Sequence, residues 1–181
     1  AASDVYKRQD LEDFVLQYPD AARKHLETAP ETLGSEKLAA LNTALQHNGL
    51  VIMADREISC PLEIFHFISG DNVAVFPATL VIAETGSRLH ILERHVSADH
   101  GSQFCGALQQ HHLSSASSVK YALVQELNSR SRAVELCHIM ADDSAEMEHL
   151  VSHPGAAWAR QETVCLLNGD SANVRLLSAS H

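Results

Sequence analysis

The feature that most constrains the fold of this chain is a turn followed by an alternating apolar run, which recurs along the sequence. The four units start at Gly86, Ser117, Ser144 and Ser171, at nearly equal intervals, and read GSRLHIL, SSVKYALV, SAEMEHLV and SANVRLLS. A second short apolar run precedes each of them: TLVIAE, FCGALQQ, AVELCHIM and ETVCLLN. Two strands per repeat of nearly constant length are typical of a β-solenoid, in which each coil buries its face against its neighbours.

A β-sandwich or barrel stays open as an alternative, because strands separated by turns every dozen or so residues also fit those folds. Further strands are expected at 50–53, 61–68 and 78–84, where short apolar or alternating runs contain β-branched residues. No helical pattern lies between the strands, which argues against an α/β sheet. We therefore predict a mainly β fold with a parallel β-helix core over residues 49–181.

A helical segment is expected before this core, over residues 10–48. Pro19 and Pro30 break it into short pieces, because proline cannot continue a helix interior. Ser35 is predicted to cap the last helix and Gly49 to end it. Three leucines at i, i+3 and i+7 predict the buried face of that helix: Leu38, Leu41 and Leu45.

Both ends of the chain differ from what a complete protein would show. Residues 1–9, AASDVYKRQ, do not resemble the pattern that follows and are interpreted as a tail, compatible with a foreign tag. The last residues, NVRLLSASH, still alternate like a strand. We therefore expect an interior fragment of a longer protein, with the β-helix cut at its C-terminal end.

Charge and cysteine spacing exclude several classes of function. The net charge of −10 argues against nucleic acid or an anionic membrane as a partner. No apolar run approaches the length needed to cross a bilayer, so no membrane span is predicted. None of the four cysteines forms a C-x-x-C pair, which argues against a zinc knuckle or a ferredoxin-type cluster. They are Cys60, Cys105, Cys137 and Cys165. Lone cysteines fit buried thiols in a reducing cytoplasm.

Twelve histidines raise the question of a metal site. His111 and His112 are adjacent, and side chains of adjacent strand residues point to opposite faces. His90 and His95 also face apart, whereas His149 and His153 share a face but lie about 13 Å apart along a strand. We therefore expect histidines at the rim or in solvent and assign no metal ligand among them, while a site with ligands from different coils stays open as an alternative.

The remaining polar residues are interpreted as structural. Glu93 shares a face with Leu89 and Ile91, and with Gln125 of the next coil it is expected to form a stack of polar groups at a corner. Cys137 and Cys165 are separated by close to one repeat length, which suggests a stacked interior pair. The carboxylates of Asp142 and Asp143 are expected in a solvated turn. No nucleotide-binding, hydrolase or metalloprotease motif is present, so we predict no catalytic residue and no enzyme activity.

Several stretches, taken in order, resemble one known family. EKLAALNTALQHNGLVIM, PLEIFHFI and PATLVIAETGSRLHILERH are similar to the SufB/SufD family of iron–sulfur cluster assembly proteins, and more to SufD. YALVQEL at 121–127 and RQETVCLLNGDSANVRLL at 160–177 extend the likeness. The resemblance covers residues 10–181. No single motif distinguishes the family, but the order of the motifs along the chain does.

The resemblance implies a right-handed parallel β-helix and a scaffold role. A SufD-like subunit pairs with a SufB-like paralogue, a SufC-like ATPase binds through a region beyond residue 181, and the complex builds a transient Fe–S cluster. The cluster ligands of the family lie in that later region, so no cofactor-binding residue is assigned here and the fragment alone is expected to bind no cofactor. A metal- or carbohydrate-binding β-solenoid or jelly-roll protein remains the alternative.

Overall fold

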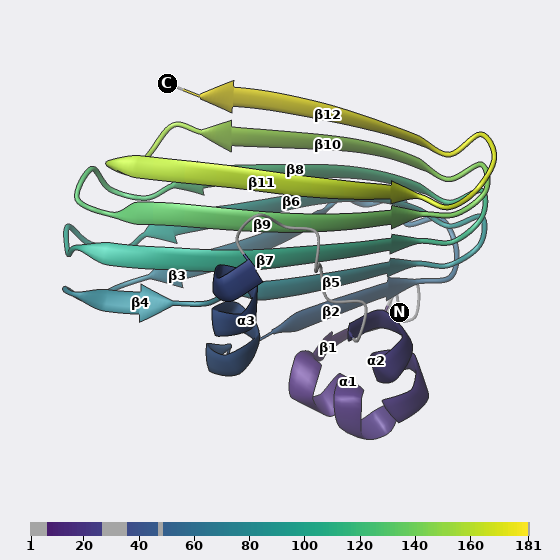
Figure 1. The fold of residues 1–181 in the computed structure, drawn as a ribbon, viewed down its shortest axis with the longest axis horizontal. Helices are drawn as coiled ribbons and strands as arrows, with labels where there is room; N and C mark the ends of the chain where they lie inside the picture. Colours follow the sequence, from purple (N-terminus) through teal and green to yellow (C-terminus); the bar gives the residue numbers. More distant parts are fainter. Residues whose placement is uncertain (1–6, 27–35, 47–48, 181) are drawn as a thin grey trace.

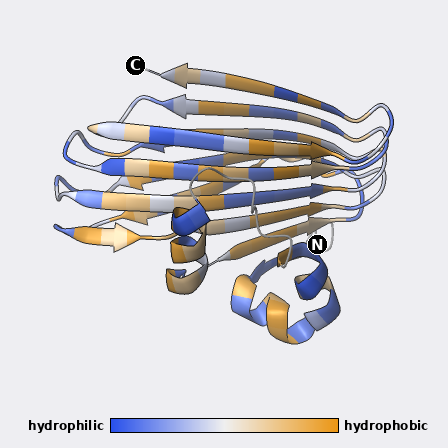
Figure 2. Ribbon diagram, viewed as in Figure 1, coloured by the Kyte–Doolittle hydropathy of each residue, from blue (hydrophilic) through white to orange (hydrophobic). Residues whose placement is uncertain are grey.

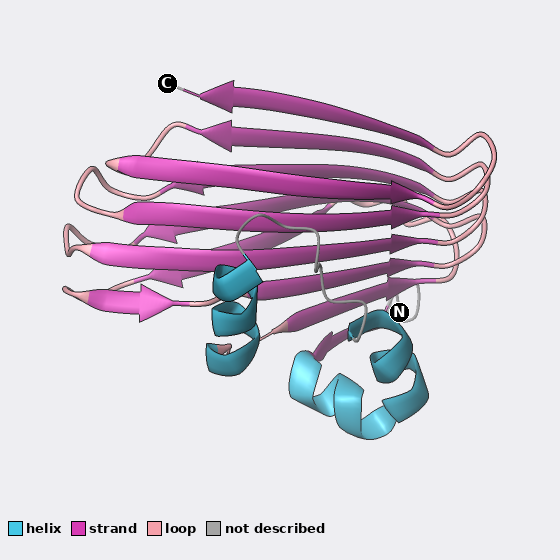
Figure 3. Ribbon diagram, in the orientation of Figure 1, coloured by secondary structure: helices cyan, strands magenta, loops and turns pink. Residues whose placement is uncertain are grey.

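The structure is a computed structural model that describes residues 7–26, 36–46 and 49–180. Two sheets lie face to face, and the chain passes from one to the other at most of its turns (Figures 1 and 3). The first sheet has the order β1-β2-β5-β7-β9-β11, with β4 beside β7, and the second has the order β12-β10-β8-β6-β3.

The strands of the first sheet are β1 (Lys7–Asp10), β2 (Leu50–Ala54), β4 (Val73–Val75), β5 (Ala78–Ala83), β7 (Gln103–Leu113), β9 (Arg132–Ala141) and β11 (Trp158–Leu167). Those of the second are β3 (Leu62–Ile68), β6 (Arg88–Ser97), β8 (Ser118–Glu126), β10 (Glu146–His153) and β12 (Asn173–Ser180). All neighbours pair in parallel except β1 and β2. The parallel β-solenoid is therefore confirmed, and a sandwich or jelly roll, built from antiparallel strands, is excluded.

One corner of the solenoid repeats a left-handed backbone conformation in four successive coils. Positive φ angles of 73°, 57°, 56° and 59° occur at Gly86, Ala116, Ser144 and Ser171. The β6–β8, β8–β10 and β10–β12 registers place these residues opposite one another. Three of the four predicted turn positions were thus correct, while Ser117 lies one residue past the repeating position.

The space between the two sheets is the main core. Side chains that alternate along each strand fill it, among them Ile52, Val81, Leu89, Leu123 and Ile139. The outer face of the first sheet is apolar too, and Figure 2 shows β2 hydrophobic along its length. A strand buried on both faces needs a cover on its outer side.

The helices provide this cover: α1 (Leu11–Gln17), α2 (Pro19–Leu26) and α3 (Glu36–Leu45). Asp10 caps α1 by accepting a hydrogen bond from the backbone N–H of Glu12, and Pro19 begins α2, where its missing N–H costs nothing. Phe14 of α1 is fully buried against the outer face of β2 and β5. None of the helices in the described ranges is long and apolar enough to cross a bilayer.

The predicted face of α3 was right for one of its three leucines. Leu38 is half-buried and packs against the first sheet, but Leu41 and Leu45 are exposed. The buried residues are Ala39 and Asn42. The side-chain amide of Asn42 donates to the backbone carbonyls of Pro77 and Gly106, at 2.9 and 2.6 Å, and so holds α3 against the first sheet. The hydrogen bonds of Asn42, rather than the leucine pattern, thus determine which face of α3 lies against the sheet.

Other expectations for the N-terminal part have different outcomes. Helix α3 ends at Leu45, before Gly49 is reached, so Gly49 is not its stop. A Cβ at Gly49 would lie 2.6 Å from the side chain of Leu11, which shows that close packing requires the glycine. Ser35 and Pro30 lie outside the described residues. Within the interpreted tail, residues 7–9 belong to β1 and pair with β2.

Candidate functional site

Polar side chains interrupt the apolar interior of the solenoid in two adjoining clusters. Each contributing strand has alternating side chains inside, so the in–out period places the residues in the core. The carboxylate–histidine cluster contains His66, Glu93, His95, Tyr121 and Glu135 from β3, β6, β8 and β9. The His–Cys–His cluster contains His111, Cys137 and His149 from β7, β9 and β10.

The carboxylate–histidine cluster is held by mutual hydrogen bonds. One ring nitrogen of His95, Nε2, lies 2.9 Å from Oε1 of Glu93, and the other, Nδ1, lies 3.1 Å from Oε1 of Glu135. The hydroxyl of Tyr121 donates to the second oxygen of Glu93. His66 lies directly opposite His95 in the β3–β6 register, with its Nε2 3.3 Å from Glu93. The three groups at the centre, Glu93, His95 and Glu135, are fully buried.

These contacts set the charge states in the carboxylate–histidine cluster. Burial alone raises the pKa of Glu93, but hydrogen bonds from His66 and His95 reverse this and hold it well below 4.5. Burial alone lowers the pKa of His95. The Cys105 sulfur, 3.9 Å from Nδ1, and the hydrogen bonds to Glu135 and Glu93 raise this pKa well above 6.5. At neutral pH a buried imidazolium therefore lies between two carboxyl groups.

The His–Cys–His cluster has a different electrical character. Burial lowers the pKa of His149 to about 4, and burial together with the neighbouring His149 lowers that of His111 well below 6.5. Burial also raises the pKa of the Cys137 thiol well above 9. All three groups are therefore neutral at physiological pH, and they can act as lone-pair donors.

Tyr121 joins the two clusters. Its ring packs edge-on against His111, at 4.5 Å between ring centroids, and stacks on His149 at 5.4 Å. Its hydroxyl reaches Glu93. Tyr121 thus contacts one cluster through its hydroxyl and the other through its ring.

Most of the described histidines are buried, although we expected them at the rim or in solvent. His90 and His100 are exposed, as predicted. The expectation was wrong for seven others, which are buried because both faces of the first sheet and the interior of the solenoid are covered: His25, His95, His111, His112, His138, His149 and His153. The predicted opposite orientation of neighbours is confirmed, since His111 points inward while His112 packs on His25 of α2 at 4.6 Å between centroids.

The predicted stacks also need correction. Glu93 lies opposite Leu123, whereas Gln125 lies opposite His95. Cys137 lies opposite Thr163, and Cys165 lies opposite Ile139, so these cysteines share the interior but do not stack. Asp142 and Asp143 are exposed, as expected.

One of the clusters carried a signal in the sequence. His66 and His95 are separated by about the length of one coil, and they are stacked neighbours. The His–Cys–His cluster had no comparable signal, because its members come from two different sheets.

Comparisons with known proteins agree with this architecture. Residues 66–181 match the family described as SUF system FeS cluster assembly, SufBD core domain, which covers well over half of the chain. The chain is similar to iron–sulfur cluster assembly SufBD family proteins of Porphyra purpurea (31% identical over 85 residues, 46% of this chain and 17% of the relative) and Staphylococcus aureus (23% over 169 residues, 92% and 36%). These alignments span about a sixth to about a third of the relatives' lengths. The chain therefore belongs to the SufBD family of SUF-system iron–sulfur cluster assembly proteins.

Proposed function

We propose that this chain is a SufD-like scaffold subunit of a cytoplasmic SUF-type assembly complex and is not itself an enzyme. The observation that carries the proposal is that the family match falls on the solenoid. The match covers residues 66–181, and the described part of this range, from His66 in β3 to Ser180 in β12, consists of stacked coils. The matched part is thus a rigid, repetitive framework, and such frameworks serve to present surfaces to partners.

The proposed partners are a SufB-like paralogue and a SufC-like ATPase, the latter bound through sequence beyond residue 181. The last two described strands support a further subunit or further coils at this end. Leu167 and Leu176 occupy inward-facing positions of β11 and β12, yet they are 54% and 49% exposed. Apolar side chains at the end of a stack are covered by another coil or by a partner.

The iron–sulfur cluster is cargo in this proposal. It forms transiently in the full complex, and this chain provides shape and contact surface while the ATPase performs the chemistry that consumes nucleotide. Net charge supports a protein partner over nucleic acid, because a chain of −10 repels phosphate backbones.

The test is co-expression of the complete reading frame, carrying an affinity tag, with the SufB-like and SufC-like proteins of the same source. We expect all three to co-purify and the anaerobic complex to accumulate cluster absorbance. We expect no ATP hydrolysis by the tagged subunit alone. Failure to capture either protein, under conditions where those two proteins bind each other, would contradict the proposal. Carbohydrate binding without capture of either partner would favour the alternative function.

A further inference from the structure

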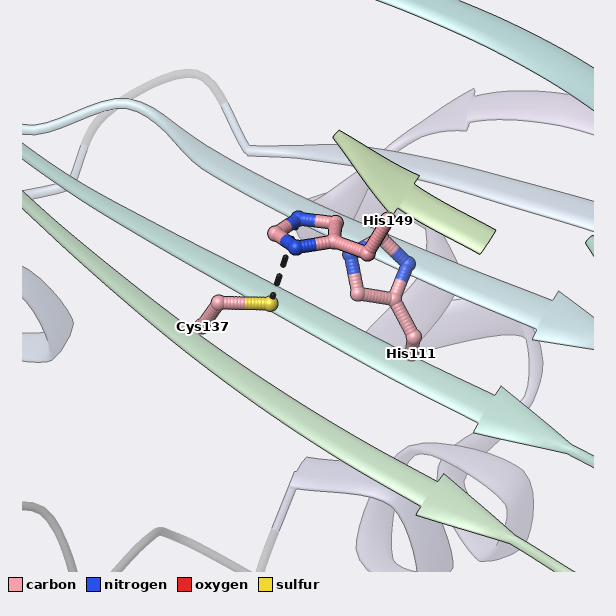
Figure 4. Close-up of side chains that lie close together, drawn as sticks. All are labelled: His111, Cys137 and His149. Carbon is pink, nitrogen blue, oxygen red and sulfur yellow. Dashed lines mark hydrogen bonds between the residues drawn. The ribbon is translucent and has the colours of Figure 1, made fainter. Parts of the chain in front are cut away.

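The inference concerns the His–Cys–His cluster, which the scaffold role does not use. Figure 4 shows the side chains of His111, Cys137 and His149 turned toward one another in the space between the sheets. One ligand atom from each lies within 4.8 Å of the other two. The residues are 0%, 0% and 1% exposed, so no bulk solvent reaches them.

One member of this cluster, His111, lacks hydrogen-bond partners within the described part of the chain. Neither ring nitrogen of His111 has a hydrogen-bond partner there, although both are buried. Leaving a buried polar atom unpaired costs about 1–3 kcal/mol. The nearest polar contact in the cluster is weak, with Cys137 Sγ 3.7 Å from His149 Nε2. The unpaired nitrogens of His111, beside a thiol and a second imidazole in a dry core, indicate a ligand that bonds to His111.

The carboxylate–histidine cluster offers a useful contrast. It also contains three ligand-type side chains near one another: His66, Glu93 and His95. There, however, Glu93 uses both oxygens and His95 uses both ring nitrogens in hydrogen bonds, and His66 Nε2, which makes no hydrogen bond of regular geometry, lies 3.3 Å from the Glu93 carboxylate. Its charges are already balanced by protein groups, so it needs no cation.

The distances in the His–Cys–His cluster suit a small metal ion. Zinc–sulfur and zinc–nitrogen bonds of about 2.3 and 2.0 Å at a tetrahedral angle place the two ligand atoms about 3.5 Å apart. The observed separation of Cys137 Sγ and His149 Nε2 is 3.7 Å. The remaining separations between the ligand atoms are at most 4.8 Å.

We propose that His111, Cys137 and His149 form a buried site for one Zn²⁺ ion, with a fourth coordination position left to a non-protein ligand. The donor set selects the metal. One thiolate and two imidazoles suit a borderline cation, whereas Mg²⁺ and Ca²⁺ require oxygen ligands.

Binding replaces one proton by the metal. The thiol of Cys137 loses its proton to solvent and the sulfur lone pair binds the cation, while the imidazoles are already neutral and lose nothing. The raised pKa of this buried thiol opposes the exchange, and the metal–sulfur bond must compensate for it. One proton is therefore released for each ion bound.

The test uses the purified chain after removal of metals with a chelator, so it requires no SUF partner and its failure would leave the proposed function untouched. Co²⁺ is titrated as the spectroscopic probe. We expect one equivalent to bind, with thiolate-to-cobalt charge-transfer absorption and tetrahedral visible bands, and one equivalent of Zn²⁺ to displace it. Cys137→Ala and His149→Gln should each weaken Co²⁺ binding by about tenfold or more and remove or distort these bands.

Cys105→Ala is the matched control, because Cys105 is also fully buried and its sulfur also lies near a histidine, 3.9 Å from His95 Nδ1. Binding that persists in C137A, or is lost in C105A or in the exposed-thiol variant Cys60→Ala, would overturn the assignment. If a variant fails to fold, X-ray absorption of the zinc-loaded unmodified chain decides. We expect one sulfur and two imidazole scatterers, and a first shell without sulfur would overturn the site.

Discussion

Glu93 and His95, close neighbours on β6, both point into the solenoid and join through a 2.9 Å hydrogen bond without access to solvent. A strand places alternate side chains on one face, so this pair is local in sequence. Its other partners, Glu135 and Tyr121, arrive from β9 and β8. Neighbouring coils are therefore joined at this pair by hydrogen bonds between charged and polar side chains, in addition to the apolar contacts of the core.

Glu93→Gln should be strongly destabilising. Removing one partner of a buried ion pair leaves the other charge uncompensated, at a cost of about 3–5 kcal/mol. Urea unfolding followed by circular dichroism measures the change. The control is Glu126→Gln, which removes the partly exposed pair with Arg94 on the outer face and should cost about 1 kcal/mol or less. Equal effects of the two substitutions would contradict the role given to burial.

Stability should decline on the alkaline side of neutrality. The folded-state pKa of His95 is raised well above 6.5, so its contribution is complete below pH 6.5 and is lost as the pH rises through the folded value. The contribution of Glu93, whose pKa is lowered well below 4.5, is complete above that pH and is lost only in acid. Glu135→Gln removes one carboxyl partner of His95, and we expect the alkaline loss to begin at lower pH.

The measurement is the free energy of unfolding at a series of pH values from weakly acidic to alkaline. Glu84→Gln, at an exposed site beside the β5–β6 turn, is the matched carboxylate control and should leave the alkaline limb in place. An alkaline limb that is the same in the E135Q and E84Q variants would show that His95 is not held by Glu135.

Asn42→Ala should loosen α3 from the sheet. The substitution removes two donors from the carbonyls of Pro77 and Gly106, and we expect a loss of about 1–3 kcal/mol. Hydrogen exchange should report faster exchange in α3 than in the coils. Leu41→Ala, on the exposed side of the same helix, is the control and should change stability by about 0.5 kcal/mol. A larger effect of L41A would restore the leucine face as the docking surface.

The repeated left-handed corner predicts opposite effects of reciprocal substitutions. Gly86→Ala should cost about 1 kcal/mol from backbone strain alone, because a Cβ there meets nothing within 4 Å. Ala116→Gly, at the equivalent position of the next coil, relieves such strain and should not destabilise the protein. Thermal unfolding of both variants makes the comparison. A loss in A116G as large as that in G86A would contradict the assignment.

The chain alone should not retain an iron–sulfur cluster. A cluster needs several thiolate or imidazole ligands that converge, and only one thiolate belongs to the His–Cys–His cluster. Anaerobic reconstitution with iron and sulfide, followed by desalting, should leave less than stoichiometric cluster. Stoichiometric retention that is lost in Cys105→Ala or Cys137→Ala would instead place a cluster site within these 181 residues.

Periodicity in the sequence determined the architecture. Alternation with period two predicted that Leu89, Ile91 and Glu93 share a face, and the nearly constant repeat length predicted parallel coils, and the structure confirms both. The spacing of His66 and His95, about one repeat length, likewise agrees with their position as neighbours on adjacent strands. Its right-handed winding remains a prediction. Ser117, however, shows the limit of a repeat read by eye, because the turn position is Ala116 and an error of one residue exchanges the two faces.

Only the tertiary structure decided which inward side chains meet. The period within one sheet says nothing about the offset between facing sheets, and that offset is fixed by how both sets of side chains pack. His111 and Cys137 from the first sheet therefore reach His149 from the second without any common spacing. The same holds for Asn42, whose partners are backbone carbonyls and leave no pattern in the sequence. The sequence determined that the chain forms stacked coils, whereas the contacts between inward side chains depended on how the two facing sheets pack.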